Sequence, residues 1–347
     1  GTVLAACERI LGAIACEAGD LGTAKPRISR SFEIRSGLDS ATRGALPDEI
    51  ERLERCEIDT LVEFAIGDKE TLAVVVGSSG RTARLLPVGR ASIEELVRRL
   101  LDPATFDEKA ARELHGMLLR PFEAQLGARI GIVPHGILSS LPLEMLISEG
   151  THASFGRDHS IVYLSRPPLG GAKSIPGSGA VQASGSFVVA GGANEAPRPA
   201  VLPWLEKRFA PVCTIDPKSV GDLVRGAAGA RWIHLESVLR LDPDSLRGLR
   251  LDPVLVLLAK GDVGAGRAAS TDALHAAGVQ DVVANLWPVD AAKPVLLLRF
   301  YDHLAGGESA PEAMHAARRE LMDGSPEAGV QQVGPRLWAA WVVHRRF

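Results

Sequence analysis

The sequence predicts an α/β protein in which a mostly parallel central sheet is flanked by helices and preceded by a small N-terminal strand meander with its own helices. Two observations support this fold class. Strand and helix patterns alternate after residue 186, which is typical of parallel sheets built from βαβ units. The segment VLVLL at 254–258 is an unbroken apolar run, which indicates a strand buried on both faces of a sheet.

The N-terminal half is expected to contain a helical segment, then strands, then helices. Residues 1–57 are interpreted as an N-terminal helical segment, which would suit the end of an upstream helical repeat region. The segments TLVEFAI, TLAVVVG and ARLLPV, between residues 60 and 88, predict a meander with glycine-containing turns. Apolar spacing between 92 and 126 predicts two helices, the first beginning with a capping box of Ser92 and Glu95.

Two more segments complete this half. RIGIVPHGILSSLPLEML predicts a buried strand, a turn and a short helix, and HSIVYLS predicts another strand. Residues 58–165 are therefore expected to form one half of the folded region. The stretch 166–186 is rich in Gly, Ser and Pro and predicts a linker to the second half at 187–347.

The second half alternates strands and helices. Strands are predicted in FVVAGG, APVCTID, RWIHLES, VLVLL, VQDVVAN and RLWAAWVV. Helices are predicted in LPWLEKRFA, STDALHAAG, AAKPVLLLRFYDHLAGG and APEAMHAARRELMDG, with Gly278 as the C-cap of the second. The carboxyl ends of the parallel strands are where an open α/β sheet places its chemistry, which draws attention to Lys260 just beyond VLVLL.

Composition excludes several functional classes. The formal net charge is -3 with acids and bases mixed along the chain, so neither nucleic acid nor a membrane surface is an expected partner. No apolar run approaches the roughly 18 residues that would span a bilayer. The four cysteines, Cys7, Cys16, Cys56 and Cys213, form no C-x-x-C pair, which favours reduced, buried thiols in a cytoplasmic protein.

No cofactor or metal is expected. The glycine-rich segments GANEAPRP and GDVGAG lack both the P-loop ending and the context of a dinucleotide fingerprint. Cysteine and histidine do not cluster at the spacing of zinc ligands.

Several pieces resemble the CHAT domains, a caspase-like family of bacterial cysteine peptidases that are often joined to tetratricopeptide repeats. The clearest is ANLWPVD followed by a helix that carries Phe300 and Tyr301. The segments IVPHGILSSLPLEML, YLSRPP, LPWLEKRFA and RLWAAWVV are similar to other family segments and follow in the same order, with His135 where the family usually has Asp. The resemblance extends from about residue 60 to the C-terminus and implies a caspase-like fold.

The resemblance also implies a Cys-His dyad, in which a thiolate attacks the scissile carbonyl and a histidine activates it. The family's His-x-Ala-Thr-His-Gly strand matches IHLESV, which places the first, structural histidine at His234 and the catalytic histidine at Val238. The cysteine position falls on Lys260. Both members of the dyad are therefore substituted, and the loops that follow them are short. The remaining cleft candidates are His234, Glu236, Asp262, Trp287, Asp290 and His135.

Three functions remain open. The leading hypothesis is a catalytically inactive, caspase-like pseudopeptidase that binds a protein partner as a scaffold or regulator, the partner being an active CHAT peptidase or a tetratricopeptide-repeat region. One alternative is an active hydrolase that uses other residues, for example Cys213 with His234 as base, although Cys213 is expected inside a strand and His234 in the core. The other is a small-molecule sensor that uses the vacant cleft.

Overall fold

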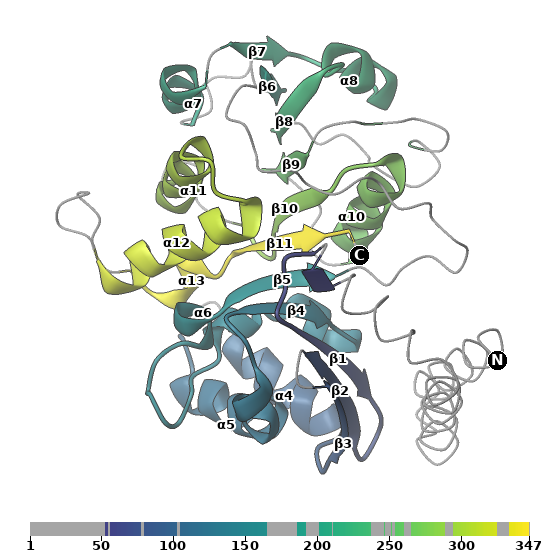
Figure 1. Ribbon diagram of the computed structural model, residues 1–347, viewed down its shortest axis with the longest axis vertical. Coiled ribbons are helices and arrows are strands. Elements are labelled where there is room, and N and C mark those ends of the chain that lie inside the picture. Colours follow the sequence, from purple (N-terminus) through teal and green to yellow (C-terminus); the bar gives the residue numbers. More distant parts are fainter. Residues whose placement is uncertain are drawn as a thin grey trace. The chain divides into compact units, whose positions relative to one another are not determined.

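The computed structural model describes residues 53–54, 56–77, 80–102, 105–164, 186–191, 201–209, 211–236, 246, 251, 254–259, 265–288, 294–324 and 333–346. The chain divides into two compact units, with the boundary between His159 and Ser160 (Figure 1). Residues 166–185 of the predicted linker and most of the predicted N-terminal helical segment lie outside the described residues, whereas Ser186, the last residue of that linker, begins a strand. Among the described residues, no helix is both long and apolar enough to cross a membrane.

Unit 1 contains the predicted strand meander. Strands β1 (Thr60–Ile66), β2 (Thr71–Gly77) and β3 (Gly80–Leu86) pair antiparallel in order, and β4 (Arg129–Val133) pairs parallel with β1 on its other side. Alternate side chains of β1 are buried, because successive residues of a strand point to opposite faces of the sheet. The meander predicted at 60–88 is confirmed.

The helices of unit 1 follow the strands, as predicted. They are α4 (Arg90–Leu100), α5 (Glu108–Leu118), the 3₁₀ helices η1 (Arg120–Gln125), η2 (Gly136–Ser140) and η3 (Leu143–Met145), and the single turn α6 (Phe155–Asp158). The capping box predicted at Ser92 is wrong, because α4 begins earlier with Gly89 as its N-cap. A Cβ at Gly89 would lie 2.1 Å from the carbonyl oxygen of Asp68, so close backbone packing sets this helix start.

Unit 2 is built on a large, mostly parallel sheet. Its strands are β5 (Ser160–Leu164), β6 (Ser186–Ala190), β7 (Val212–Ile215), β8 (Ala230–Leu235), β9 (Leu255–Leu258), β10 (Asp281–Asn285) and β11 (Trp341–Arg345). Their order in the sheet is β5-β11-β10-β9-β8-β6-β7. All of these neighbours pair parallel except β10 and β11, which pair antiparallel.

Helices cover both faces of this sheet (Figure 1). Helices α8 (Val220–Gly226) and α10 (Ala265–Ala277) pack on one face, where their apolar side chains join a core cluster with β6, β8, β9 and β10. Helices α7 (Leu202–Arg208), α11 (Val295–Ala305) and α12 (Ala310–Asp323) lie on the other, and α13 (Pro335–Trp338) precedes β11. The predicted α/β fold class, with its parallel sheet between helices, is confirmed.

Two details of unit 2 show how local sequence controls these elements. Helix α12 begins with a capping box, in which Ser309 and Glu312 satisfy each other's backbone N–H groups. Helix α10 is followed by Gly278, as predicted, with a φ of 118°. A Cβ at Gly278 would lie 2.5 Å from the carbonyl oxygen of Leu251, so the turn into β10 requires glycine.

Candidate functional site

The imidazole of His234 is the centre of a buried hydrogen-bond chain in unit 2. His234 lies near the carboxyl end of β8 and is fully buried. Its Nδ1 atom lies 2.5 Å from the hydroxyl oxygen of Tyr301 on α11, and its Nε2 atom lies 2.8 Å from Oε1 of Glu236. Both ring nitrogens are therefore engaged, which confirms the prediction that His234 is a satisfied core histidine.

Aromatic side chains surround the Tyr301 end of this chain. The ring of Tyr301 makes an edge contact with Phe187 at 5.6 Å between centroids, and Phe209 packs against Trp232 at 5.3 Å. Burial in these surroundings raises the pKa of the Tyr301 hydroxyl well above its ordinary value, and the negative charge of Glu236 raises this pKa further. The hydroxyl therefore keeps its proton.

Glu236, the second hydrogen-bond partner of His234, lies at the carboxyl edge of the sheet, directly after β8. Its backbone N–H donates to the carbonyl of Ala190 at the end of β6, which holds it beside the neighbouring strand. Its side chain is 11% exposed. His234 and Glu236 are two residues apart in an extended chain, so their side chains project to the same face of the sheet.

Cys213 does not lie near the hydrogen-bonded residues Tyr301, His234 and Glu236. The register aligns Cys213 with Val188 and Val188 with Ile233, so Cys213 shares the face of Ile233 and not that of His234. Strand β6 also separates β7 from β8. Cys213 is exposed, which contradicts the prediction of an interior position, because β7 is an edge strand whose central residues reach solvent. The buried thiol at Cys56 agrees with its prediction.

Comparison with known proteins agrees with this architecture. A family model described as CHAT domain matches residues 216–346, which include β8 to β11 and helices α8, α10, α11 and α12. Over these residues the chain is similar to the CHAT domain family. No curated protein matches the chain.

Trp287 lies two residues after the end of β10, in the region that matches the CHAT domain model. Its indole Nε1–H donates to the carbonyl of Arg336 at 3.0 Å, and the guanidinium of Arg336 lies 5.5 Å from the ring centroid. The side-chain amide of Asn285 donates to the carbonyl of Trp287 at 3.1 Å. These contacts hold the end of β10 against α13, the helix that precedes β11. The side chain of Trp287 therefore has a packing role at this turn.

None of the other cleft candidates is seen to contact Tyr301, His234 or Glu236 in the described part of the structure. His135 belongs to unit 1, where its Nδ1 accepts a hydrogen bond from the N–H of Ile66 at 3.1 Å and orders the turn after β4. Four positions lie outside the described residues: Val238, Lys260, Asp262 and Asp290. Among the described residues, no group of three or more His, Cys, Asp or Glu side chains is arranged to hold a metal ion.

Tyr301 takes part in the hydrogen bonds around His234, but it was not among the cleft candidates predicted from the sequence. The available signal was a tyrosine on the apolar face of an amphipathic helix, because a buried tyrosine hydroxyl needs a hydrogen-bond partner. The resemblance singled out Phe300 and Tyr301 only as helix markers. Their positions gave no indication of the partner, which lies 67 residues earlier in the sequence.

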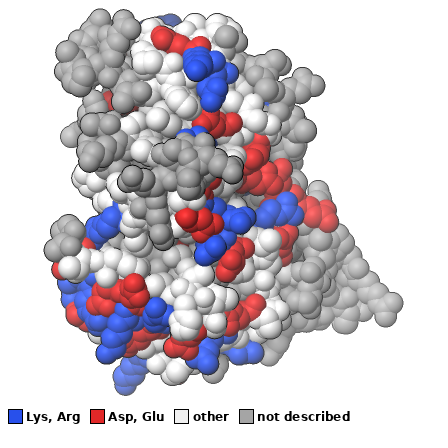
Figure 2. Space-filling model, turned by 90° about the vertical axis from the view of Figure 1, so that its left-hand side faces the viewer, with Lys and Arg blue, Asp and Glu red and all other residues white. Residues whose placement is uncertain are grey.

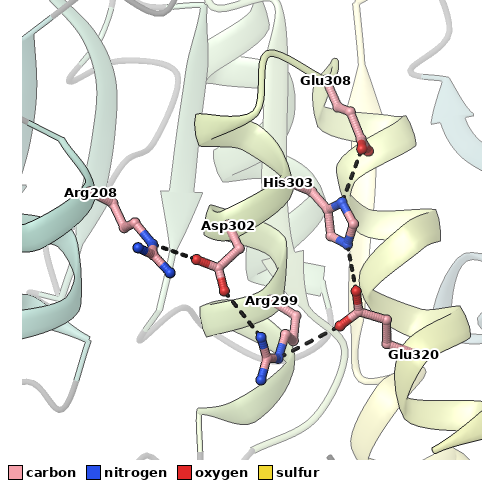
Figure 3. Close-up of polar contacts among 6 residues, drawn as sticks. All are labelled: Arg208, Arg299, Asp302, His303, Glu308 and Glu320. Carbon is pink, nitrogen blue, oxygen red and sulfur yellow. Dashed lines mark hydrogen bonds and ion pairs between the residues drawn. The ribbon is translucent and has the colours of Figure 1, made fainter. Parts of the chain in front are cut away.

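A second polar cluster joins α7, α11 and α12 on the surface of the CHAT domain (Figure 3). It is a series of contacts along six residues: Arg208, Asp302, Arg299, Glu320, His303 and Glu308. His303 lies between two carboxylates, 2.9 Å from Glu308 and 3.0 Å from Glu320. These side chains are all partly exposed, so the cluster contributes modestly to holding the helices together.

Proposed function

We propose that this CHAT domain is catalytically inactive and acts as a protein-binding module. The proposal is carried by the substitutions at the two dyad positions, and the structure adds an argument against the alternative site of Cys213 and His234: both nitrogens of His234 are held, by Tyr301 and Glu236. A histidine base needs one nitrogen within hydrogen-bond reach of a thiol. His234 meets a phenol and a carboxylate instead, so its geometry favours a structural role.

The sequence at the family's dyad positions supports the same proposal. Val238 replaces the catalytic histidine, and valine cannot transfer a proton. Lys260 replaces the nucleophilic cysteine, and an amine of ordinary basicity is almost fully protonated at neutral pH. The exposed thiol of Cys213 supports it further, because this thiol lies on the opposite face of the sheet from His234.

A protein is the partner class that this reasoning favours. The parallel sheet retains a carboxyl edge, where α/β proteins bind ligands, while the nucleophile and base at that edge have been replaced. A fold retained without its chemistry is suited to recognition. Within this class we propose another CHAT domain or a helical repeat region.

Peptidase assays on the full chain test the proposed inactivity. We expect no turnover of a mixed fluorogenic peptide library, and we expect Cys213 to react with iodoacetamide as an ordinary exposed thiol. His234→Gln and Cys213→Ser are the diagnostic variants. Peptide cleavage that either substitution abolishes would show that the site is active and that the proposal is wrong.

A further inference from the structure

Strand β7 (Val212–Ile215) is an open edge of the sheet in unit 2. Of the strands that the structure describes, only β6 pairs with it (Figure 1). Its two central residues, Cys213 and Thr214, are exposed, so solvent reaches this edge. An edge strand presents N–H and C=O groups on which another strand can form. The outer side of β7 is therefore a template for a further strand.

The outward backbone groups of this edge belong to Val212 and Thr214. The carbonyl groups of Pro211 and Ile215 accept hydrogen bonds from β6 or from the residue directly after it. Backbone groups of successive strand residues point alternately to the two sides, so Cys213 also faces β6, whereas Val212 and Thr214 face away. In the described part of the chain these outward groups have no hydrogen-bond partner. Both residues are therefore available to a second strand.

These two residues are placed symmetrically about Cys213. In an antiparallel pair, opposite residues alternately exchange two N–H···O bonds and none. When a second β7 lies antiparallel with a two-fold axis at Cys213, Val212 of each copy opposes Thr214 of the other. Both members of each pair present outward groups, so about four hydrogen bonds form across the axis. The edge is thus complementary to its own copy, as a two-fold interface requires.

The charges around β7 favour a second copy over a charged peptide. The strand itself carries no charge and no proline, the residue types that commonly prevent pairing at sheet edges. The four charged residues between 211 and 226 form two ion pairs, Lys218 with Asp216 at 2.7 Å and Arg225 with Asp222 at 2.6 Å. This surface therefore offers no net charge to attract a charged peptide, and two copies meet there without like-charge repulsion.

The ends of β7 fix the register of such a pair. With the axis at Thr214 instead, Val212 would oppose Asp216, which lies beyond the strand and is paired with Lys218. With the axis at Cys213, Asp216 stays outside the paired segment. The two copies of Asp216 are then roughly 20 Å apart along the strands. This separation exceeds the Debye length of about 8 Å at physiological ionic strength, so their repulsion is screened.

We propose that two copies of this chain associate antiparallel through β7, with Cys213 at the two-fold axis. The association is noncovalent and goes beyond the proposed function, because it does not depend on catalytic inactivity. A paired segment this short buries little area, so the dimer is weak and its population rises with protein concentration. At low concentration the protein is monomeric and Cys213 stays accessible.

Disulfide trapping of the full chain tests the pair at its axis. Cys213 opposes itself as a non-hydrogen-bonded pair, with Cα atoms about 4.5 Å apart, and this lies within the range that a disulfide bridges. The other cysteines are replaced, Cys7 and Cys16 by Ser and Cys56 by Ala. With copper phenanthroline at micromolar protein, we expect a covalent dimer on a non-reducing gel that dithiothreitol dissolves. Absence of this dimer would overturn the proposal.

A cysteine moved by one residue controls for random collision. In the same background, Cys213→Ser with Thr214→Cys keeps one exposed thiol on β7. Residue 214 then opposes Val212 of the other copy, so its thiol meets its own copy only diagonally. We expect this variant to cross-link at least about tenfold more slowly than Cys213, because the diagonal Cα distance exceeds disulfide geometry. Equal or faster cross-linking would overturn the proposed pairing.

Sedimentation velocity measures the association without a covalent bond. For the reduced wild type, we expect a sedimentation coefficient that rises with protein concentration. Thr214→Pro removes an outward N–H from an edge strand, where proline is tolerated. The two-fold axis makes this a loss of two hydrogen bonds, so the association should weaken at least about tenfold. A constant coefficient in the wild type would overturn the proposal.

Added lysines provide a second variant and its control. Thr214→Lys leaves the backbone donor in place and introduces the residue that commonly blocks sheet edges, so it should also weaken the association. Ala228→Lys adds the same charge at an exposed residue before β8, two strands in from the edge, and should associate like the wild type. Unchanged association in both Thr214 variants, or an equal loss in Ala228→Lys, would contradict pairing through β7.

Failure of the dimer and failure of the proposed function give different results. Cleavage of peptides would refute the inactive module, whatever the state of association. A protein that stays monomeric and cleaves no peptide would refute only the pairing through β7.

Discussion

At the scale of single residues, the environment of each histidine determines what its ring can do. His234 has a hydrogen-bond partner at each ring nitrogen, so both nitrogens are satisfied. His115 on α5 is buried too, yet neither of its ring nitrogens has a hydrogen-bond partner. Burial lowers the pKa of His115, and the carboxylate of Glu123, 3.8 Å from Nε2, only partly opposes this effect.

Acid should therefore destabilise the protein through His115. The unfolded chain binds the proton near the ordinary pKa of 6.5, whereas the folded chain resists it. The stability contribution is complete above that pH and is lost as the pH falls below it, by about 1.4 kcal/mol per unit of pKa difference. We expect the urea unfolding midpoint to be lower at acidic than at neutral pH, and His115→Gln to weaken this dependence.

His152→Asn is the control for this prediction. His152 is exposed and has a positive φ that asparagine tolerates, so its replacement removes a surface imidazole without straining the backbone and shows what the loss of a histidine outside the core does. His275 adds a dependence of the same sign, because its pKa is also lowered by burial. The effect of His115→Gln is therefore partial, and an identical pH profile in this variant and the wild type would contradict the prediction.

Residue identity predicted part of the site. The burial of His234 follows from its place in an apolar strand, and the assignment of Val238 and Lys260 to the dyad positions stays a prediction from the family pattern. The orientation of Glu236 does not, because it depends on Tyr301 from a helix 67 residues away. Cys213 has an apolar setting but lies on an edge strand, and edge position depends on strand order, which local sequence does not encode.

At the scale of elements, the long periodic helices were predicted, whereas of the two seven-residue helices α7 was predicted and α8 was not. Helices α4, α5, α11 and α12 have 11 to 14 residues, enough to show a helical apolar period. Helix α8 has 7 residues, too few for a clear period, and was not predicted. Its start is encoded locally, since Ser219 accepts a hydrogen bond from the N–H of Asp222.

Gly278 links α10 to β10 and should be sensitive to any side chain. Alanine there would combine an unfavourable positive φ with a Cβ 2.5 Å from the Leu251 carbonyl oxygen. We expect Gly278→Ala to reduce the free energy of unfolding by at least about 2 kcal/mol, measured by urea denaturation.

Gly229→Ala separates the effect of the positive φ from the effect of a steric contact. Gly229 also has a positive φ, 75°, but a Cβ there would meet nothing within 4 Å. This variant should lose only the backbone contribution, about 1 kcal/mol. Equal losses at the two positions would show that contact with Leu251 is not the cause.

At the scale of the whole molecule, charge is dispersed and nearly balanced. The chain has 39 basic and 42 acidic side chains, and Figure 2 shows both signs interspersed over the described part of one face. Nucleic-acid binding depends on a basic surface that displaces counterions from phosphates. This surface has no such concentration in the part of the face that the structure describes.

We therefore expect no binding to nucleic acid near physiological ionic strength. In a gel-shift assay with a short DNA duplex and a single-stranded RNA, neither should shift at micromolar protein in about 0.15 M salt. A basic DNA-binding domain provides the positive control. A shift that weakens steeply with added salt would show a basic surface outside the described residues.

The fold class and the position of most strands and long helices could be predicted from the sequence. These follow from local signals, because burial periodicity and glycine or proline punctuation act over a few residues. Local signals do not give the strand order that places Cys213 at an edge, nor the hydrogen bonds that join Tyr301, His234 and Glu236. The reason is physical: side chains meet across a folded sheet only after its topology has closed the long stretches of chain between them.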